Sequence, residues 1–164
     1  MNKAYILLGG NIGDVRANFT KVEVFLVSDG IKITNKSSIY VTKAWGKENQ
    51  PDFLNQVLGI EVDFDANSLL TRLLSIERVI GRIREEGKKW LERVIDIDIL
   101  FFNDEIINNP PTLIIPHPYI PFRKFTLTPL FELIPNYVHP SSNKTIAELL
   151  AECKDDLEVK KIDL

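Results

Sequence analysis

Two aspartates stand one residue apart in a strongly apolar segment, residues 94–102, that is typical of a β-strand. Side chains alternate between the two faces of a strand, so Asp96 and Asp98 would project from one face, with Cα atoms about 6.6 Å apart. The apolar residues expected on the opposite face are Ile95, Ile97, Ile99 and Phe101. Neighbouring carboxylates repel each other and resist burial, so such a pair commonly shares a cation or accepts hydrogen bonds.

The aspartate pair predicts a magnesium site. Carboxylate oxygens on one rigid strand are suitable ligands for Mg²⁺, particularly when the phosphates of a substrate complete the octahedral shell. Two ions about 3.5–4 Å apart could share the pair. The alternative interpretation is a half-exposed strand with polar residues on its outer face.

A local cluster of bases precedes the aspartates, although the chain carries a net charge of -3. Its members are Arg78, Arg82, Arg84, Lys88, Lys89 and Arg93. Metal-binding carboxylates faced by guanidinium groups make a phosphate site, because the metal neutralises bridging oxygens and arginines hold the others. A solvated helix end and loop would also explain the cluster. The chain has no G-x-x-x-x-G-K-[ST] segment, which excludes a P-loop enzyme. Residues 9–13 lack G-x-G-x-x-G and are interpreted as a tight turn between a strand and a helix.

The elements that must position these residues are expected in the order β-α-β-β-α-β, judged from apolar periodicity and turn residues. The expected ranges are strands at 5–8, 31–43, 53–64 and 94–102, and helices at 14–30 and 65–81. This order is the split arrangement of ferredoxin-like folds. We therefore predict an α+β fold with an antiparallel sheet and both helices on one face, leaving the other face for a site or for the remaining chain. Residues 82–92 have charge but no apolar period and are predicted to form an exposed, mobile loop.

The remaining chain is rich in proline and is predicted to be a loop-rich C-terminal extension. Short helices are expected near 128–134 and 145–153, and a last strand at 159–162. The length of 164 residues, 45% of them hydrophobic and 26% charged, predicts one soluble domain, 1–164. The lone Cys153 excludes an internal disulfide, and no apolar run approaches the ~20 residues of a membrane span. The apolar run at the start of the chain is also too short for the core of a signal peptide, so we expect a cytoplasmic protein that binds no membrane. The net negative charge argues against nucleic-acid binding.

The segment Trp90-Leu91-Glu92-Arg93-Val94-Ile95-Asp96-Ile97-Asp98-Ile99-Leu100 resembles the W-G-P-R-x-L-D-[LIV]-D-[IL]-[LM] signature of the 6-hydroxymethyl-7,8-dihydropterin pyrophosphokinases of folate biosynthesis. Supporting matches lie in the same order across residues 5–131. They are residues 8–13, 40–42, 50–55, 76–77, 81–84, 115–118, 123–125 and 129–130.

The resemblance implies Mg²⁺-dependent transfer of pyrophosphate from ATP to 6-hydroxymethyl-7,8-dihydropterin, giving AMP and the pterin diphosphate. It implies that Asp96 and Asp98 hold two Mg²⁺ ions, that Arg82 and Arg93 act on the phosphates, and that Arg84 and Trp90 belong to a loop that closes over the site. The implied ATP pocket contains Glu77, Arg82, Arg84, Trp90, Arg93, Ile99, His117 and Arg123. The implied pterin pocket contains Thr42, Ala44, Trp45, Phe53, Asn55 and Phe125. We expect a monomer whose partners are these two small-molecule substrates.

The pterin pocket also agrees with the chemistry of its residues. Phe53 and Phe125 could sandwich a flat heterocycle, and the Asn55 amide offers a donor and an acceptor. Core packing of the two phenylalanines, and a capped loop histidine at His117, are the alternatives. The chain departs from the family in three places. Gly10 replaces the serine of G-S-N, which is expected to be harmless, and Leu91-Glu92 replaces Gly-Pro, which is expected to leave the loop more mobile. Tyr119 stands where many members carry a basic residue, so one phosphate or ribose contact is expected to be weaker.

Three other functions are compatible with the sequence. A binding module could hold pterin or nucleotide without turnover, although the intact aspartates and arginines count against it. A metal-dependent phosphohydrolase would release phosphate or pyrophosphate into water. The chain could also be one subunit of a larger folate-pathway assembly.

Overall fold

An antiparallel sheet runs through the centre of the computed structural model, which describes residues 1–43, 51–81 and 94–162. The two central strands, β1 (Asn2–Gly10) and β4 (Phe53–Val62), pair along nine positions from Asn2↔Val62 to Gly10↔Leu54. β5 (Asp96–Phe102) pairs with the other edge of β1, and β2 (Lys32–Lys36) and β3 (Tyr40–Thr42) both pair with β4. β8 (Val159–Lys161) pairs with β3. The predicted ferredoxin-like α+β arrangement is confirmed.

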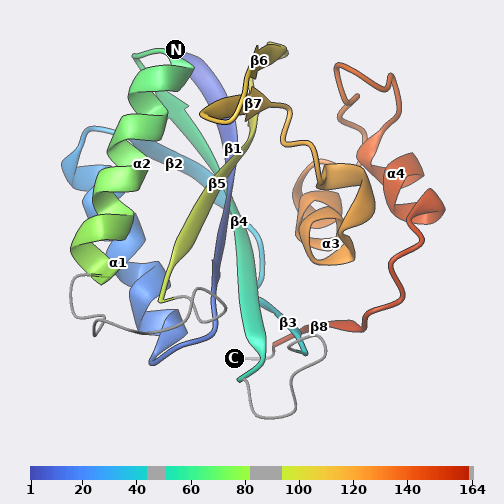
Figure 1. Cartoon of the computed structure of the whole chain (residues 1–164), viewed down its shortest axis with the longest axis horizontal. Helices are drawn as coiled ribbons and strands as arrows, with labels where there is room; N and C mark the ends of the chain where they lie inside the picture. The colour runs from blue at the N-terminus through green and yellow to red at the C-terminus, as the bar shows by residue number, and fades with distance from the viewer. Residues whose placement is uncertain (44–50, 82–93, 163–164) are drawn as a thin grey trace.

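Two helices cover one face of this sheet (Figure 1). Asp14 caps the start of α1 (Val15–Ser28), and its carboxylate accepts a hydrogen bond from Ala17 N at 3.1 Å. Asp65 caps the start of α2 (Ala66–Ile80) and accepts from Ser68 N at 2.9 Å. Each cap satisfies a backbone donor that the first helical turn leaves free. The helices bury their apolar stripes against the sheet in a first core, which includes Leu8, Phe19, Leu26, Leu58, Ile60 and Leu73.

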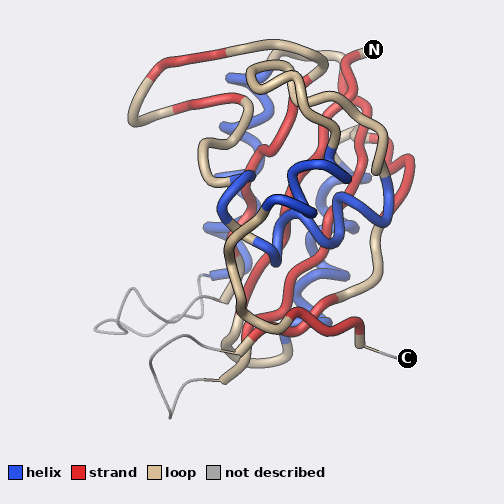
Figure 2. Tube along the Cα trace, turned by 90° about the vertical axis from the view of Figure 1, so that its right-hand side faces the viewer, coloured by secondary structure: helices blue, strands red, loops and turns tan. Residues whose placement is uncertain are grey.

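The C-terminal part covers the opposite face with α3 (Lys124–Leu133) and α4 (Ile146–Glu152). Figure 2, turned so that this side faces the viewer, shows these helices lying across the strands. They form a second core with the sheet, which includes Leu7, Val57, Phe101, Leu127, Leu130 and Leu149. The extension also contains a hairpin, β6 (Ile107–Asn109) with β7 (Leu113–Ile115), and a short 3-10 helix, η2 (Ile120–Phe122). Among the described helices, none is long and apolar enough to cross a membrane.

The prediction of one strand over residues 31–43 was wrong, because Ser37 interrupts it. Ser37 N donates to Val57 O at 2.9 Å, and Ser37 Oγ accepts from Val57 N at 2.9 Å. A side-chain oxygen thus takes the place of a backbone acceptor in the ladder, and the chain turns out of the strand at this point. The result is two strands, β2 and β3, along successive parts of β4.

The prediction that Phe101 lies on the same face of the strand as Ile97 and Ile99 was also wrong, because β5 contains a bulge. Ile6 pairs with Ile99 but Tyr5 pairs with Phe101, so Leu100 is an extra residue on β5. A bulge reverses the alternation of side chains beyond it. Phe101 therefore packs in the second core, and Phe102 takes the place expected for it in the first.

α3 begins at Lys124, earlier than the start expected near Thr128. Pro129 consequently lies inside the helix rather than in its first turn, where a proline ring is tolerated best. No hairpin was predicted in the C-terminal extension. β6 and β7 were missed because each strand has only three residues.

α3 is held against the sheet by Glu132. Its carboxylate accepts from Ser38 N and Ser38 Oγ at 3.1 Å, and from Tyr40 Oη at 2.6 Å. Partial burial raises the pKa of Glu132, but the hydrogen bonds from Tyr40 and Ser38 and the charge of Lys161 outweigh it, and the net pKa is lowered. Burial, together with the hydrogen bond to Glu132 and its charge, raises the pKa of Tyr40.

Glu132→Gln is therefore expected to lower the free energy of unfolding by about 1 kcal/mol at pH 7, since charge-assisted bonds weaken and the site is partly screened by water. A lowered pKa means that Glu132 stabilises the fold above its ordinary value of 4.5 and loses this effect as the pH falls through the lower, folded value. Denaturant unfolding of both proteins from pH 7 to pH 3 checks this. The difference between them should shrink below about pH 4.5; a constant difference would contradict the prediction.

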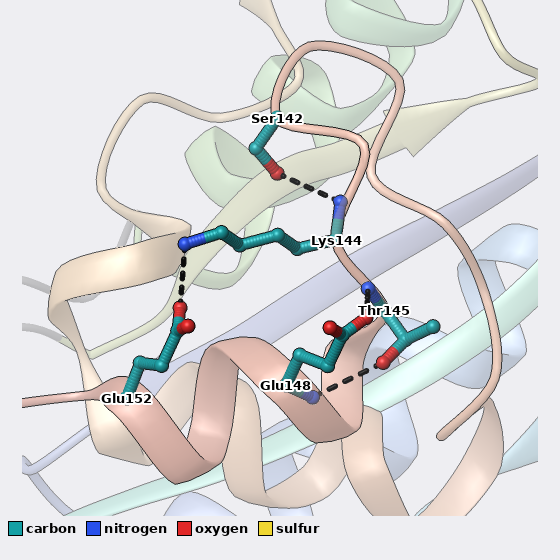
Figure 3. A network of polar contacts seen from close by, with 5 residues as sticks. All are labelled: Ser142, Lys144, Thr145, Glu148 and Glu152. Carbon is teal, nitrogen blue, oxygen red and sulfur yellow. Dashed lines mark hydrogen bonds and ion pairs between the residues drawn. The ribbon is translucent and has the colours of Figure 1, made fainter.

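A capping box fixes the start of α4 (Figure 3). Glu148 N donates to Thr145 Oγ1 at 3.1 Å, and Thr145 N donates to Glu148 Oε1 at 3.0 Å. Thr145→Ala should lower the free energy of unfolding by about 1 kcal/mol. Ser142→Ala is the matched control, because Ser142 Oγ makes only a 3.4 Å contact with Lys144 N outside the helix. Equal unfolding midpoints for Thr145→Ala and the wild type would contradict the cap's contribution.

Candidate active site

Asp96 and Asp98 lie on the face of β5 that is turned toward α3. The register pairs Asp98 with Leu7, which packs in the second core, and pairs Asp96 with Gly9. Ile97, between them, packs in the first core on the other side of the sheet. Both aspartates are half-buried. The two carboxylates therefore project together from one face, as strand alternation predicts.

Glu77 of α2 supports the backbone between the two aspartates. Its Oε2 accepts a hydrogen bond from Ile97 N at 2.6 Å. β5 stands at one end of the described sheet, so this contact satisfies a donor on an outer strand. Glu77 thus contacts the strand that carries the carboxylates and helps to fix their position.

Gly9 makes room for a side chain of β4, the neighbouring strand in the sheet. The Asn55 amide lies across β1, with Nδ2 donating to Leu8 O at 3.3 Å. A Cβ atom at position 9 would lie only 2.8 Å from this nitrogen. The interpretation of residues 9–13 as a tight turn was wrong for Gly9 and Gly10, which belong to β1; the residue of this segment with a positive φ is Gly13, at 70°. Gly9 is needed for close approach of Asn55.

Asn55 joins a polar and aromatic region on the same face. Asn55 pairs with Tyr40, and Phe53 pairs with Thr42, so these four side chains share the face of β4 and β3 that α3 covers. Asn55 and Thr42 are buried, and the Thr42 hydroxyl has no hydrogen-bond partner among the described residues. A buried hydroxyl without a partner is costly, so it is a candidate contact for a bound polar ligand.

His117 approaches the aspartates from the segment after β7. His117 N donates to Leu100 O at 3.0 Å, and its Nε2 lies 4.0 Å from Asp98 Oδ2. Its Nδ1 accepts a hydrogen bond from Tyr119 N at 3.2 Å, which places the proton of the neutral ring on Nε2, on the side of Asp98. Burial and the Arg123 guanidinium lower the pKa of His117, and the Asp96 carboxylate opposes them. The ring is therefore a neutral donor near pH 7.

Arg123, just before α3, contacts two aromatic rings. Its guanidinium carbon is 4.4 Å from the centre of the Tyr119 ring and 5.6 Å from the centre of the Phe125 ring. Phe125 is partly buried against the second core. A guanidinium stacked on aromatic faces keeps its N–H donors directed outward, where they can bind an anion.

Several predicted site residues are placed differently or are not described. The Ile99 side chain packs in the first core, away from the carboxylates, so any contact with a nucleotide would come from its backbone. The predictions for Ala44, Trp45, Arg82, Arg84, Trp90 and Arg93 lie outside the described residues. Sequence reasoning missed the role of Gly9 beside Asn55 and the ring contact of Tyr119 with Arg123.

In the part of the chain that the structure describes, no group of three or more His, Cys, Asp or Glu side chains is arranged to hold a metal ion. Two carboxylates on one face are nevertheless the donor set that suits Mg²⁺, which is commonly held by one or two carboxylates and completed by substrate phosphates and water. The residues present therefore fit a metal that arrives with a phosphate ligand rather than a metal held by protein alone.

The structure is thus a ferredoxin-like α+β protein in which paired carboxylates and a polar and aromatic region share one sheet face, with a histidine beside the carboxylates. This arrangement is suited to phosphate and heterocycle chemistry. Residues 5–135 match the family model "7,8-dihydro-6-hydroxymethylpterin-pyrophosphokinase (HPPK)". The chain belongs to this family. It is thus a pyrophosphokinase, a transferase of folate biosynthesis.

Individual relatives agree with this family. A 2-amino-4-hydroxy-6-hydroxymethyldihydropteridine pyrophosphokinase of Aquifex aeolicus is 38% identical over 152 residues, which are 93% of this chain and 92% of the relative. The Haemophilus influenzae protein of the same name is 35% identical over 161 residues, 98% of each chain. A crystal structure of Plasmodium falciparum HPPK-DHPS has the same fold, with a TM-score of 0.70 and 21% identity, and the match covers 92% of this chain and 43% of that one.

Proposed function

We propose that this chain catalyses the Mg²⁺-dependent transfer of pyrophosphate from ATP to the hydroxymethyl group of 6-hydroxymethyl-7,8-dihydropterin, with release of AMP. The observation that carries the proposal is the common face of Asp96, Asp98 and Asn55, with His117 beside Asp98. One end of this face supplies carboxylates that could hold Mg²⁺ for a triphosphate. The other end supplies a polar and aromatic surface for a flat heterocycle. Family membership supports both halves.

The phosphate half of the site would work by alignment and charge neutralisation. Asp96 and Asp98 would hold two Mg²⁺ ions, and bound Mg²⁺ would neutralise charge on the transferred phosphates. His117 keeps a proton at Nε2 and can donate it in a hydrogen bond to a phosphate or ribose oxygen. The Arg123 guanidinium adds a fixed positive charge. Glu77 holds the strand that bears the two carboxylates.

The pterin half would fix the acceptor hydroxyl. Asn55 offers an amide whose position is set by Leu8 O. The buried Thr42 hydroxyl, which has no partner among the described residues, would be a further contact for the ligand. Phe53 and Phe125 would contact the ring faces. In the transfer itself, the pterin hydroxyl oxygen forms a bond to the β-phosphorus and gives up its proton to solvent. The bond from that phosphorus to the α–β bridging oxygen breaks, and AMP leaves with the electron pair. Correct alignment of these atoms is the main contribution required of the protein.

Residues known only from the sequence complete the proposal. Arg82 and Arg93 would act on the transferring phosphates, and Arg84 and Trp90 would close over the site with ATP bound. Ala44 and Trp45 would add to the pterin pocket. We further propose that residues 1–164 act as one cytoplasmic domain and as a monomer, because Asp96, Asp98 and Asn55 lie on one sheet face of a single chain.

Incubation with ATP, Mg²⁺ and 6-hydroxymethyl-7,8-dihydropterin, followed by chromatography, tests the proposal. AMP should form only when the pterin is present. ATP breakdown without pterin would favour a phosphohydrolase. Binding of both ligands without AMP would favour a binding module.

A further inference from the structure

Tyr119 contacts two ionisable residues of the C-terminal extension, His117 and Arg123. Its ring lies 4.4 Å from the Arg123 guanidinium carbon and 5.8 Å, centre to centre, from the His117 ring, at 48°. Its backbone N–H donates to His117 Nδ1. Tyr119 therefore holds a histidine through its backbone and an arginine through its side chain.

The local backbone keeps the Tyr119 ring in place. Tyr119 is the residue before η2, where Phe122 N donates to Tyr119 O at 3.0 Å and Ile120 N donates to His117 O at 3.3 Å. Ile120 is fully buried in the second core and anchors this turn. Tyr119 itself is 52% exposed, so burial of its own ring does not explain its position. One part of its surface contacts water while its face covers the guanidinium.

The contact restricts the Arg123 side chain. An arginine side chain free in water occupies many rotamers, and ordering it on binding costs affinity. A ring face that holds the guanidinium in advance reduces this cost, and it leaves the planar N–H donors free to contact oxygen atoms. The Phe125 ring, at 5.6 Å, adds a second and more distant contact.

We propose that Tyr119 is a positioning residue for ATP, which acts by holding the Arg123 guanidinium ready for the nucleotide. This inference rests on the proposed function, because it takes ATP as the ligand of Arg123. It replaces the expectation that Tyr119 merely weakens a phosphate or ribose contact. The hydroxyl group of Tyr119 is not required, since the ring face makes the contact.

Three variants separate the ring from the rest of the residue. Tyr119→Leu removes the aromatic face, Tyr119→Phe keeps it, and both retain the backbone N–H that binds His117. Phe122→Leu is the matched control, because it makes the same type of change at a side chain of the same turn that is 68% exposed. The Kd of ATP is measured by calorimetry with Mg²⁺ and without pterin, followed by KM and kcat with pterin.

Tyr119→Leu should raise the Kd and KM of ATP about two- to five-fold, which is the scale of an exposed cation–π contact. Because the contact orders Arg123 before ATP binds, kcat should change less than KM. Tyr119→Phe and Phe122→Leu should both have the Kd and KM of the wild type for ATP. In an Arg123→Ala background, Tyr119→Leu should have no further effect.

Wild-type affinity in Tyr119→Leu, or the same loss with and without Arg123, would overturn the inference. Should Tyr119→Leu unfold, the ring-current shift of the Arg123 side-chain protons in the wild type decides; absence of that shift would overturn the contact. The proposed function fails separately: ATP binding without AMP formation would refute the transfer and leave the positioning role standing, whereas a wild type that binds no ATP would refute both.

Discussion

Asp98→Asn is expected to lower kcat about a thousandfold, because loss of a metal-binding carboxylate removes several kcal/mol of charge stabilisation from phosphoryl transfer. Asparagine keeps the shape of the side chain and removes only its charge. Asp98 is half-buried on the face turned toward α3, and its Oδ2 lies 4.0 Å from His117 Nε2. Steady-state rates of AMP formation across a range of Mg²⁺ concentrations measure the effect.

A control separates a local effect from a general effect of charge. Asp63→Asn also removes one carboxylate, but Asp63 is exposed and follows the end of β4. It should retain the wild-type kcat. The circular dichroism spectra and melting temperatures of both variants should match the wild type. Normal turnover of Asp98→Asn at the usual Mg²⁺ concentration would contradict the role of the pair.

Asn55→Leu is expected to raise the KM of the pterin about 30- to 100-fold, with the Kd of ATP unchanged. The two side chains have a similar branched shape, but leucine cannot pair with the polar edge of the heterocycle. Polar groups of a buried ligand that lose their partners each cost about 1–3 kcal/mol. Initial rates at varied pterin concentration, with calorimetry for ATP, measure the two quantities separately.

Gln56→Leu is the matched control for this change. Gln56 is the next residue of β4, is equally buried at 6%, and also donates a side-chain amide to a backbone carbonyl, that of Ser37, at 2.7 Å. Strand alternation turns it to the opposite face. Gln56→Leu should reduce stability without changing the KM of the pterin. Equal effects of the two changes on KM would show that Asn55 acts only through the stability of the strand.

The order of the elements could be predicted because their periodic signals are long. α2 repeats its apolar residues from Leu69 to Ile80, and its start and end are set by Asp65 and Gly81. The breaks within strands could not be predicted in the same way. The division of β2 from β3 depends on Ser37 reaching Val57, and the bulge at Leu100 depends on the register with β1. Such features arise from residues far apart in the chain.

The candidate site was predictable where it depends on local alternation, as for Asp96 and Asp98 on one face of β5. The other parts of the site depend on pairing between strands that are far apart in the sequence, so they could not be predicted in this way. The closeness of Gly9 to Asn55 joins positions 46 residues apart in the numbering, and only the β1–β4 register produces it. His117 and Arg123 entered through the family resemblance alone, and the contact of Tyr119 with Arg123 became evident from the folded turn. The catalytic and binding roles of these residues stay predictions.

The intact transfer of pyrophosphate is tested most directly by ³¹P NMR of one reaction containing the protein, ATP, Mg²⁺ and 6-hydroxymethyl-7,8-dihydropterin. The two carboxylates and the acceptor pocket on one sheet face predict equal amounts of AMP and pterin diphosphate, with little free pyrophosphate. ADP with a pterin monophosphate, or pyrophosphate released into solution, would contradict that prediction.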